Sequence, residues 1–427
     1  MPRGSVSARE AAYLSLIRCE RDASYTNLEI DSKIKKYKLE GPERSLYTVL
    51  VYGVTELRLT LDYRIGACVT GDACRLDPEV KTLLRLGAYQ ILYLDRVPDP
   101  AAVNETVELA RRFAPSGAHK LVNAALRALC RTKDTPPPPP DDPIAALEVA
   151  YAVPRGIIEL WNGSYGEKET AEILDALLVR PSVTVRVNTL KTTADDLCAV
   201  LGGVTGEIPG AVVLDKKTPP EKLREALDRG LCFVQDGSSQ AAVAMVDPRP
   251  GDVLVDVCSC PGGKSFAAAM LMEGKGDIRA FDLHENKLSL VTATAAKLGI
   301  EIISVCARDA RDPDPDLLGK ADRVICDVPC SGLGVIAKKP EIRYRELDSI
   351  SRLPELQYEI LRASAGYLKP GGRLLYSTCT LNRAENEEVV GRFLSNNADF
   401  TPVASRTFFP SETNDGFFAA VLAKLAN

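Results

Sequence analysis

The sequence predicts a protein of several domains, in which a helical front is followed by a small mixed α/β section and a larger α/β domain. Three observations lead to this prediction. The chain has 427 residues, and a domain usually takes about 100 to 200. A run of prolines at 136–140 marks a linker, and from about residue 240 onward apolar strand-like segments alternate with longer helical ones.

The front, residues 1–135, is predicted to be a helical bundle. Its apolar residues recur at helical spacing, as in Leu83, Leu84, Leu86, Ile91 and then Val103, without the alternation of a strand. The proline-rich stretch 136–143 then favours a stiff, extended conformation, because prolines provide no backbone donors. We therefore place a linker at 136–143.

The middle section, residues 144–240, is predicted to be a small mixed α/β subdomain. Residues 144–180 have a helical pattern, whereas Ser182–Asn188 alternates in the manner of a strand. Two further strands are expected at Val212–Leu214 and Cys232–Val234, with helical segments around Leu197 and over Lys222–Leu227.

Residues 241–427 are predicted to form a doubly wound parallel sheet, because strands and helices alternate along this part of the chain. In such sheets ligands bind beyond the carboxyl ends of the strands. The strand candidates are Val253–Val257, Ile278–Phe281, Ile302–Val305, Val324–Cys326 and Arg373–Tyr376.

Composition and charge indicate a soluble protein rather than a membrane protein or a general polycation. Hydrophobic residues make up 45% of the chain, the formal charge is −5, and apolar runs stay short of the ~18 residues of a membrane helix. No apolar stretch follows the first charged residues, so we expect a cytoplasmic protein. Four lysines at positions 33, 35, 36 and 38 form either a phosphate-binding patch or a solvated helix face.

A cofactor site is predicted where the first of these strands runs into Cys258-Ser259-Cys260-Pro261-Gly262-Gly263-Lys264. Glycines at a strand-to-helix turn let the backbone approach a ligand closely. Asp282, at the end of the next strand, has the spacing of a ribose-binding acid. Asp309, after the third strand, is placed to accept a hydrogen bond from an adenine amino group. The turn matches neither the triphosphate-binding nor the dinucleotide glycine pattern, so the set favours S-adenosylmethionine.

Two cysteines follow neighbouring strands of the predicted sheet, Cys330 within Asp327-Val328-Pro329-Cys330 and Cys379 within Ser377-Thr378-Cys379-Thr380. A thiolate can add to carbon 6 of a pyrimidine and so make carbon 5 nucleophilic enough to accept a methyl group. Asp327 is placed to hydrogen-bond the ring nitrogen. Zinc is not expected, because the chain has two histidines and no closely spaced cysteine pair of the Cys-x-x-Cys type.

These motifs resemble those of the RNA (cytosine-5) methyltransferases of the Sun/Fmu type, and Asn414-Asp415-Gly416-Phe417-Phe418 resembles the closing strand of that family. The resemblance implies a Rossmann-like class I methyltransferase domain with Cys379 as nucleophile and Cys330 promoting product release. Lys264 and Asp327 join them as catalytic candidates, and the 258–264 loop with Asp282, Asp309 and Asp327 is the candidate cofactor site.

The front resembles a NusB-type RNA-binding domain through the segments 84–90, 102–110 and 120–127. A NusB-like domain joined to this catalytic domain implies a bacterial enzyme that acts on a cytosine of 16S ribosomal RNA, and we expect a monomer. Arg186-Val187-Asn188-Thr189-Leu190-Lys191 matches a further family segment, which makes Arg186 and Asn188 candidate RNA-binding residues.

Several alternatives remain open from the sequence. A DNA cytosine-5 methyltransferase would use Cys330 as its nucleophile, and a noncatalytic RNA-binding or assembly factor would use neither cysteine. Lys264 either caps a carbonyl or neutralises Asp327. Asn382 and Glu385 have the spacing of a helix cap with its reciprocal acid, which we favour over a catalytic role.

Overall fold

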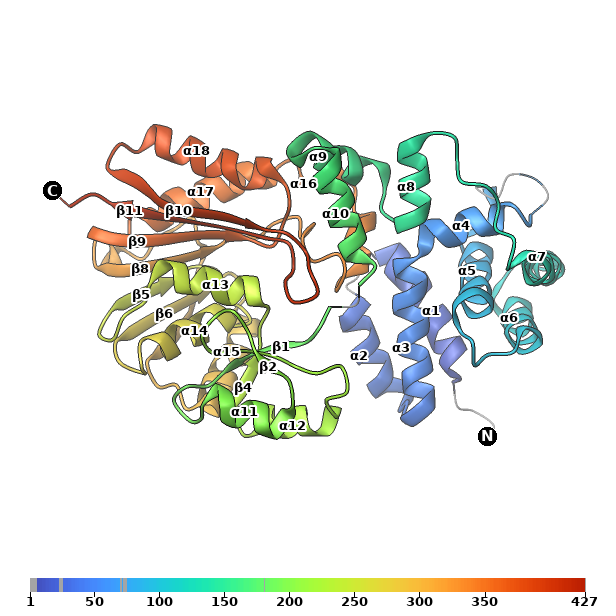
Figure 1. Cartoon of the computed structure of the whole chain (residues 1–427), viewed down its shortest axis with the longest axis horizontal. Coiled ribbons are helices and arrows are strands. Elements are labelled where there is room, and N and C mark those ends of the chain that lie inside the picture. Colours follow the sequence, from blue (N-terminus) through green and yellow to red (C-terminus); the bar gives the residue numbers. More distant parts are fainter. Residues whose placement is uncertain (1–5, 23–25, 70, 72–74, 180, 427) are drawn as a thin grey trace. The chain divides into compact units, whose positions relative to one another are not determined.

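The structure is a computed structural model that describes residues 6–22, 26–69, 71, 75–179 and 181–426. The chain forms two compact units (Figure 1). The first comprises Met1–Gly163 and Lys339–Arg345, and the second comprises Ser164–Lys338 and Glu346–Asn427.

The first unit is helical, as predicted for residues 1–135. Its most deeply buried helix carries Leu83, Leu84 and Leu86, all fully buried, and Gly87 lets a neighbouring helix approach. A Cβ at Gly87 would lie 2.5 Å from a methyl carbon of Leu126. The helices are α1 (Ala8–Asp22), α2 (Thr26–Tyr37), α3 (Gly41–Glu56), α4 (Arg58–Gly66), α5 (Pro78–Tyr93), α6 (Asp99–Phe113), α7 (Ala118–Thr132), α8 (Pro143–Tyr151) and α9 (Arg155–Tyr165), whose end falls in the second unit.

The first unit also extends past residue 135 and includes η3 (Pro340–Tyr344), a segment far away in sequence. Arg343 is buried, and its Nη1 donates to the carbonyl oxygens of Glu56, Tyr151 and Ala152 at 3.2 to 3.4 Å. These carbonyls lie at the ends of α3 and α8, where helices leave acceptors without partners. The guanidinium therefore fastens this segment to two helix ends.

The lysine patch proposed at 33–38 is smaller in the folded protein. Lys33 is mostly buried, and its Nζ lies 3.3 Å from Glu29. Lys35, Lys36 and Lys38 are exposed. Three cations thus remain available on this helix and the residue that follows it.

The second unit begins with α10 (Glu167–Leu177) and a small antiparallel sheet with the strand order β2-β3-β1-β4. Its strands are β1 (Thr184–Val187), β2 (Val204–Thr205), β3 (Ala211–Val213) and β4 (Cys232–Val234), and its helices are α11 (Ala194–Leu201) and α12 (Pro220–Asp228). The predicted strands and helices are confirmed. The two-residue strand β2 was not predicted, since so short a strand leaves no periodic pattern.

The larger sheet has the strand order β10-β11-β9-β8-β5-β6-β7. Neighbours from β9 to β7 are parallel, whereas β11 pairs antiparallel with both β9 and β10. The five predicted strands are therefore confirmed as a parallel sheet, to which β11 and β10 add an antiparallel edge that was not predicted. The strands are β5 (Val253–Asp256), β6 (Asp277–Asp282), β7 (Ile303–Ala307), β8 (Ala321–Asp327), β9 (Leu368–Thr378), β10 (Phe400–Phe408) and β11 (Phe417–Lys424).

Helices cover both faces of this sheet, because its strands are apolar on both sides (Figure 1). Leu254, Ile325 and Leu375 pack on the face of α13, α14 and α15, while their neighbours Val255 and Val324 pack on the face of α17 and α18. The helices of this part are α13 (Gly237–Val246), α14 (Gly263–Leu271), α15 (Glu285–Leu298), α16 (Leu347–Ile350), α17 (Leu353–Ala365) and α18 (Glu387–Asn396), with short 3-10 turns η2 (Pro315–Leu317) and η4 (Arg383–Glu385).

None of the helices in the described part of the chain is both long enough and apolar enough to span a membrane.

Candidate active site

The two predicted cysteines lie together at the carboxyl ends of β8 and β9. These strands are parallel neighbours, and Val328 N donates to Ser377 O at 3.1 Å just where they end. The Sγ atoms of Cys330 and Cys379 are 3.2 Å apart. The expected meeting of the two cysteines at one rim of the sheet is therefore what the structure has.

A backbone relay joins this pair to the start of β11. Gly334 N donates to the carbonyl oxygen of Cys379 at 3.0 Å, and Gly416 N donates to Gly334 O at 2.8 Å. The loop that carries Cys330 is thus hydrogen-bonded on one side to Cys379 and on the other side to Gly416, directly before β11.

Asp327 has both carboxylate oxygens bound. Lys264 Nζ lies 2.6 Å from Oδ2, and Ser377 Oγ donates to Oδ1 at 2.7 Å. The ammonium also lies 5.1 Å from the centre of the Phe417 ring, a favourable cation–π distance. Of the two roles considered for Lys264, neutralising Asp327 is the one that the geometry supports.

The 258–264 loop forms a tight turn between β5 and α14. Gly262 N donates to Ser259 O at 2.6 Å, and Ser259 N donates to Phe281 O at 2.7 Å. Gly262 has φ +109°, a backbone angle that L side chains rarely adopt, and a Cβ there would overlap the ring of Phe266. The turn is therefore limited to glycine at this position.

Asp282 lies beside this loop, as predicted from its spacing. Its Oδ2 accepts from Cys260 N at 3.3 Å, and its Oδ1 accepts from His284 N at 3.0 Å. Burial, and after it the negative charge of Asp282, raises the pKa of Cys260 to about 11, so this cysteine remains a thiol.

Asp309 follows β7, but its carboxylate is paired with Arg311, which donates from Nη2 at 2.6 Å and from its backbone N at 2.9 Å. The side-chain hydrogen bonds of Arg311 lower the pKa of Asp309. Any adenine contact of Asp309 would share this carboxylate with Arg311.

Two buried polar atoms without hydrogen-bond partners lie at this turn. Ser259 Oγ and Asp256 Oδ1 are both buried and have no hydrogen-bond partner among the described atoms. Unpaired buried polar atoms are costly and typically face a ligand or water. Together with the glycine turn and Asp282, they fit a polar cofactor such as the nucleoside part of S-adenosylmethionine.

Asp256 itself was missed as a site residue. It is fully buried at the end of β5, and Ser265 Oγ donates to its Oδ2 at 2.6 Å. Burial raises its pKa from 3.8 to about 7, and the nearby Asp327 adds to this shift. Only its position at the strand end could have indicated it.

The raised pKa of Asp256 predicts that the free energy of unfolding depends on pH. Asp256→Asn should abolish this dependence. Between pH 4 and 7 the folded protein holds a proton that the unfolded chain has lost, so stability falls as the pH rises through this window. From pH 5 to 8, wild-type protein should lose roughly 2 to 4 kcal/mol more unfolding free energy than the variant. Urea denaturation followed by circular dichroism measures this; parallel pH curves would show that Asp256 does not titrate in this range.

Arg186 and Asn188, predicted to bind RNA, are instead buried. Arg186 Nη1 donates to Pro209 O at 2.9 Å, and Asn188 Nδ2 donates to Gly230 O and Leu298 O at 2.8 and 2.7 Å. Since neither side chain reaches the surface, the RNA-binding assignment is corrected. Asn188 connects the small sheet to the end of α15.

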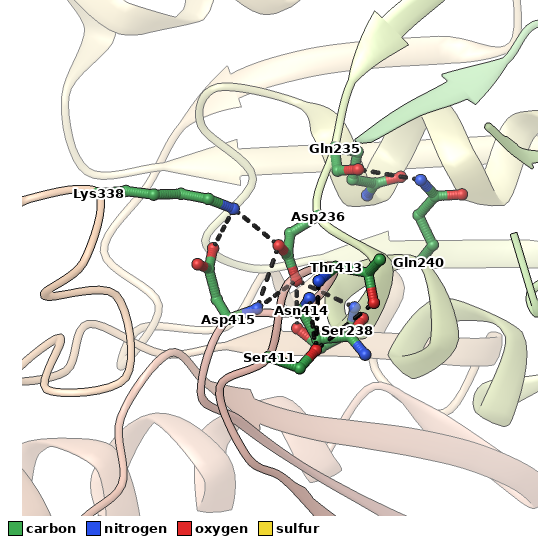
Figure 2. Close-up of polar contacts among 9 residues, drawn as sticks. All are labelled: Gln235, Asp236, Ser238, Gln240, Lys338, Ser411, Thr413, Asn414 and Asp415. Atoms are coloured by element: carbon green, nitrogen blue, oxygen red, sulfur yellow. Dashed lines mark hydrogen bonds and ion pairs between the residues drawn. The ribbon is translucent and has the colours of Figure 1, made fainter. Parts of the chain in front are cut away.

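A cluster of charges at the start of α13 was also missed (Figure 2). Lys338 Nζ lies 2.8 Å from one oxygen of Asp236 and 2.8 Å from one of Asp415. Asp236 also caps α13 by accepting from Ser238 N at 3.0 Å, and it accepts from Asp415 N at 3.1 Å. The cluster thus joins α13, the end of the Cys330 loop and the turn before β11.

The two carboxylates of this cluster share one ammonium. Burial, followed by the charge of Asp236, raises the pKa of Asp415 to about 6. Burial also opposes the charge on Asp236, but Lys338 and the hydrogen bonds lower its pKa overall. As the pH falls, Asp415 therefore takes up a proton before Asp236 does.

Asn382 and Glu385 only half follow the predicted helix cap. Asn382 Oδ1 accepts from Ala384 N at 3.2 Å and caps η4. The Glu385 carboxylate, in contrast, accepts from the Ser331 backbone N at 2.9 Å, next to Cys330. The acid therefore belongs to the cysteine site.

Among the residues that the structure describes, no group of three or more His, Cys, Asp or Glu side chains is arranged to hold a metal ion.

Comparison with known proteins agrees with this organisation. Residues 243–423 match the family described as 16S rRNA methyltransferase RsmB/F, residues 6–131 match the NusB family, and residues 153–219 match the ferredoxin-like domain of RsmF/B-like methyltransferases. A relative from Bacillus subtilis, named as a probable ribosomal RNA small subunit methyltransferase B, is 35% identical over 93% of this chain and 90% of its own length. The chain belongs to the ribosomal RNA small subunit methyltransferase B family.

Further members of this family and solved structures are also similar. The ribosomal RNA small subunit methyltransferase B of Klebsiella pneumoniae is 31% identical over 91% of this chain and 92% of that protein. The crystal structure of PH0851 has a TM-score of 0.80, with 28% identity and 99% of both chains covered. A methyltransferase homologue from Pyrococcus horikoshii, with a TM-score of 0.57 and 25% identity, covers 66% of this chain and all of its own.

Proposed function

We propose that the protein transfers a methyl group from S-adenosylmethionine to carbon 5 of a cytosine in 16S ribosomal RNA, through a covalent bond between Cys379 and carbon 6. One observation carries this proposal: two thiols 3.2 Å apart lie at the strand ends that also present Asp327, bound to Lys264 and Ser377. A nucleophile, a partner thiol and a carboxylate are the groups that this reaction needs.

The thiol pair favours Cys379 as the nucleophile. The hydrogen bond with Cys379, followed by burial, raises the pKa of Cys330 well above its ordinary value. Cys330 therefore keeps its proton and can donate a hydrogen bond to Cys379 Sγ, and such a bond would stabilise a thiolate on Cys379.

The covalent steps then follow from the positions of these groups. An electron pair of the Cys379 thiolate forms the bond to carbon 6. The π electrons of the carbon 5–carbon 6 double bond then become available at carbon 5. After carbon 5 has been methylated, a base from solvent takes the proton on carbon 5. The electrons of that bond restore the double bond, and the carbon 6–sulfur bond breaks with Cys379 leaving as a thiolate. Cys330 promotes this elimination through its thiol, which lies 3.2 Å from the departing sulfur and can donate a hydrogen bond to it.

Asp327 would orient the base. A carboxylate held by Lys264 and Ser377 can accept a hydrogen bond from the 4-amino group of cytosine. That bond would hold the ring in place while carbon 6 is attacked. The ion pair with Lys264 keeps the carboxylate in place before the base arrives.

The residues that would hold the cofactor are the 258–264 loop, Asp282 and Ser259 Oγ, with Asp309 as a further candidate. When bound, S-adenosylmethionine supplies an electrophilic methyl group. The glycine turn allows the backbone to approach the ligand, and Asp282 offers its carboxylate to ribose hydroxyls.

Support for the substrate comes from the relatives and from the front of the chain. The relatives are named small subunit methyltransferases, and residues 6–131 match the NusB family. The exposed lysines of α2 and the residue after it offer cations to phosphates.

Methylation of 16S ribosomal RNA by the purified protein tests the proposal. We expect a single cytosine to gain a methyl group on carbon 5, detected by bisulfite sequencing and by nucleoside mass spectrometry, and we expect the same site to be unmethylated in cells without the protein. Methylation of another atom or of DNA would refute the proposal. No methylation of free RNA, of small subunits or of assembly intermediates would favour the noncatalytic factor.

Replacing Asp282 by alanine should weaken S-adenosylmethionine binding by about 1 to 3 kcal/mol, because the ribose hydroxyls would lose a hydrogen-bond acceptor. Isothermal titration calorimetry measures this directly. Asp277→Ala, at the other end of β6 and paired with Arg279, is the matched control and should leave affinity nearly unchanged. Equal affinities for all three proteins would remove Asp282 from the cofactor site.

A further inference from the structure

Glu385 is fully buried, and its carboxylate receives donors from three residues. Its Oε1 accepts from Ser331 Oγ at 2.5 Å and from Asn382 Nδ2 at 2.9 Å. Its Oε2 accepts from Ser331 N and from Gln357 Nε2, both at 2.9 Å. A buried carboxylate is retained when such donors replace its hydration.

These bonds fix both sides of Cys330. Ser331, the residue after the cysteine, is bound to Glu385 through both its backbone and its hydroxyl. Gln357 Nε2 donates to Pro329 O as well, at 2.9 Å, so the residue before the cysteine is tied to the same network. Hydrogen bonds to the Glu385 carboxylate and to Gln357 therefore hold the backbone on both sides of Cys330.

Asn386, the next residue in the chain, does the same for Cys379. It is fully buried, its Oδ1 accepts from Thr378 Oγ1 at 2.5 Å, and its Nδ2 donates to Thr380 O at 3.0 Å. Thr378 and Thr380 flank Cys379. One amide side chain thus fixes both neighbours of that cysteine.

The two networks also contact each other through hydroxyl groups. Ser331 Oγ lies 2.7 Å from Thr380 Oγ1, so the residue after one cysteine contacts the residue after the other. Tyr376 OH donates to the backbone oxygen of Glu385 at 2.5 Å, which holds the turn against β9.

We propose that Glu385 and Asn386 are paired positioning residues, Glu385 for Cys330 and Asn386 for Cys379, and that together they set the approach of the two thiols. This inference rests on the proposed function, because it assigns each residue to one covalent step. Glu385 acts on release through Cys330, and Asn386 acts on attack through Cys379.

The test compares Glu385→Gln with Asn386→Ala in the full-length protein, using cofactor, 16S ribosomal RNA and denaturing electrophoresis. Misplacing a reacting group by about 1 Å can cost 10²-fold in rate. Glu385→Gln should slow release about 10- to 100-fold and accumulate a covalent protein–RNA complex, as Cys330→Ala should. Asn386→Ala should slow formation of that complex about 10- to 100-fold without accumulating it.

A second measurement reports the thiol geometry without RNA or cofactor. Diamide removes two hydrogen atoms from a pair of close thiols and leaves a disulfide, and mass spectrometry identifies the Cys330–Cys379 peptide pair. Both variants should form this cross-link about tenfold more slowly than wild type, since each frees the backbone beside one thiol. Glu388→Gln, on the exposed side of α18, is the matched control and should match wild type in both assays.

The outcomes separate this proposal from the function beneath it. If Cys330→Ala traps RNA but Glu385→Gln and Asn386→Ala behave alike, or cross-link at the wild-type rate, the positioning roles are refuted and the proposed function stands. If Cys330→Ala traps no RNA that wild-type protein methylates, the proposed roles of the two cysteines fail and the positioning roles fail with them. Should Glu385→Gln not fold, Ser331→Ala removes the hydroxyl contacts with Glu385 and Thr380 but keeps the backbone bond to Glu385, and it should show a weaker accumulation.

Discussion

Cys330→Ala should convert the protein into a covalent complex with its RNA that survives denaturing electrophoresis. The variant keeps Cys379 and Asp327, so attack at carbon 6 and methylation of carbon 5 can proceed. Elimination should then be slow, because the thiol 3.2 Å from Cys379 is missing. Turnover should fall by about 10² to 10⁴-fold, the usual contribution of one acid–base group.

Cys379→Ala is the matched variant and should give the opposite result. Without its thiolate no bond to carbon 6 can form, so both the complex and methylation should be lost. Trapping in Cys379→Ala instead of Cys330→Ala would point to the DNA-type assignment of the cysteines. Absence of any complex from either variant, with RNA that wild-type protein methylates, would contradict a covalent mechanism.

The sequence predicts the helical front and the parallel strands well, because periodicity and strand spacing are local properties. Cys232–Val234 is a strand with the predicted bounds, and Ile278–Phe281 lies within β6. The antiparallel edge is different. β10 is mostly exposed, with a buried residue at each end, so it lacks the apolar run that marked the other strands. That β11 lies between β9 and β10 depends on tertiary pairing, which no local pattern encodes.

The site shows the same division between local and long-range information. Strand ends located Cys330, Cys379, Asp327 and Asp282, because parallel strands bring their carboxyl ends to one rim. A motif gives no information on burial, and for this reason Arg186 and Asn188 were assigned to RNA although both lie inside the fold.

Long-range clusters of polar side chains could not be predicted at all. Asp236, Lys338 and Asp415 are brought together from three distant segments, and no spacing connects them before the chain is folded. Glu385 was recognised as an acid near a helix start, yet its main partner is Ser331, 54 residues earlier in the chain. Local reasoning found the cap and missed the longer contact.

Gly334→Ala should reduce the methylation rate by about 10²-fold or more while cofactor affinity changes little. A Cβ at Gly334 would overlap the carbonyl oxygen of Gly416 and lie 2.5 Å from its carbonyl carbon. Backbone atoms cannot rotate away as a side chain can, so the Cys330 loop and the start of β11 must separate. That movement breaks the relay from Gly416 through Gly334 to the carbonyl of Cys379 and displaces the thiol pair.

Gly391→Ala provides the matched control for this substitution. Gly391 lies on the exposed side of α18, and a Cβ there meets no atom within 4 Å. Because glycine is a poor helix former, this change should stabilise the helix by about 0.5 to 1 kcal/mol and leave the rate unchanged. Single-turnover methylation and calorimetric titration of S-adenosylmethionine give the two readouts. A wild-type rate in Gly334→Ala would mean that the contact with Gly416 opens without moving Cys379, and the relay would then have no part in positioning the nucleophile.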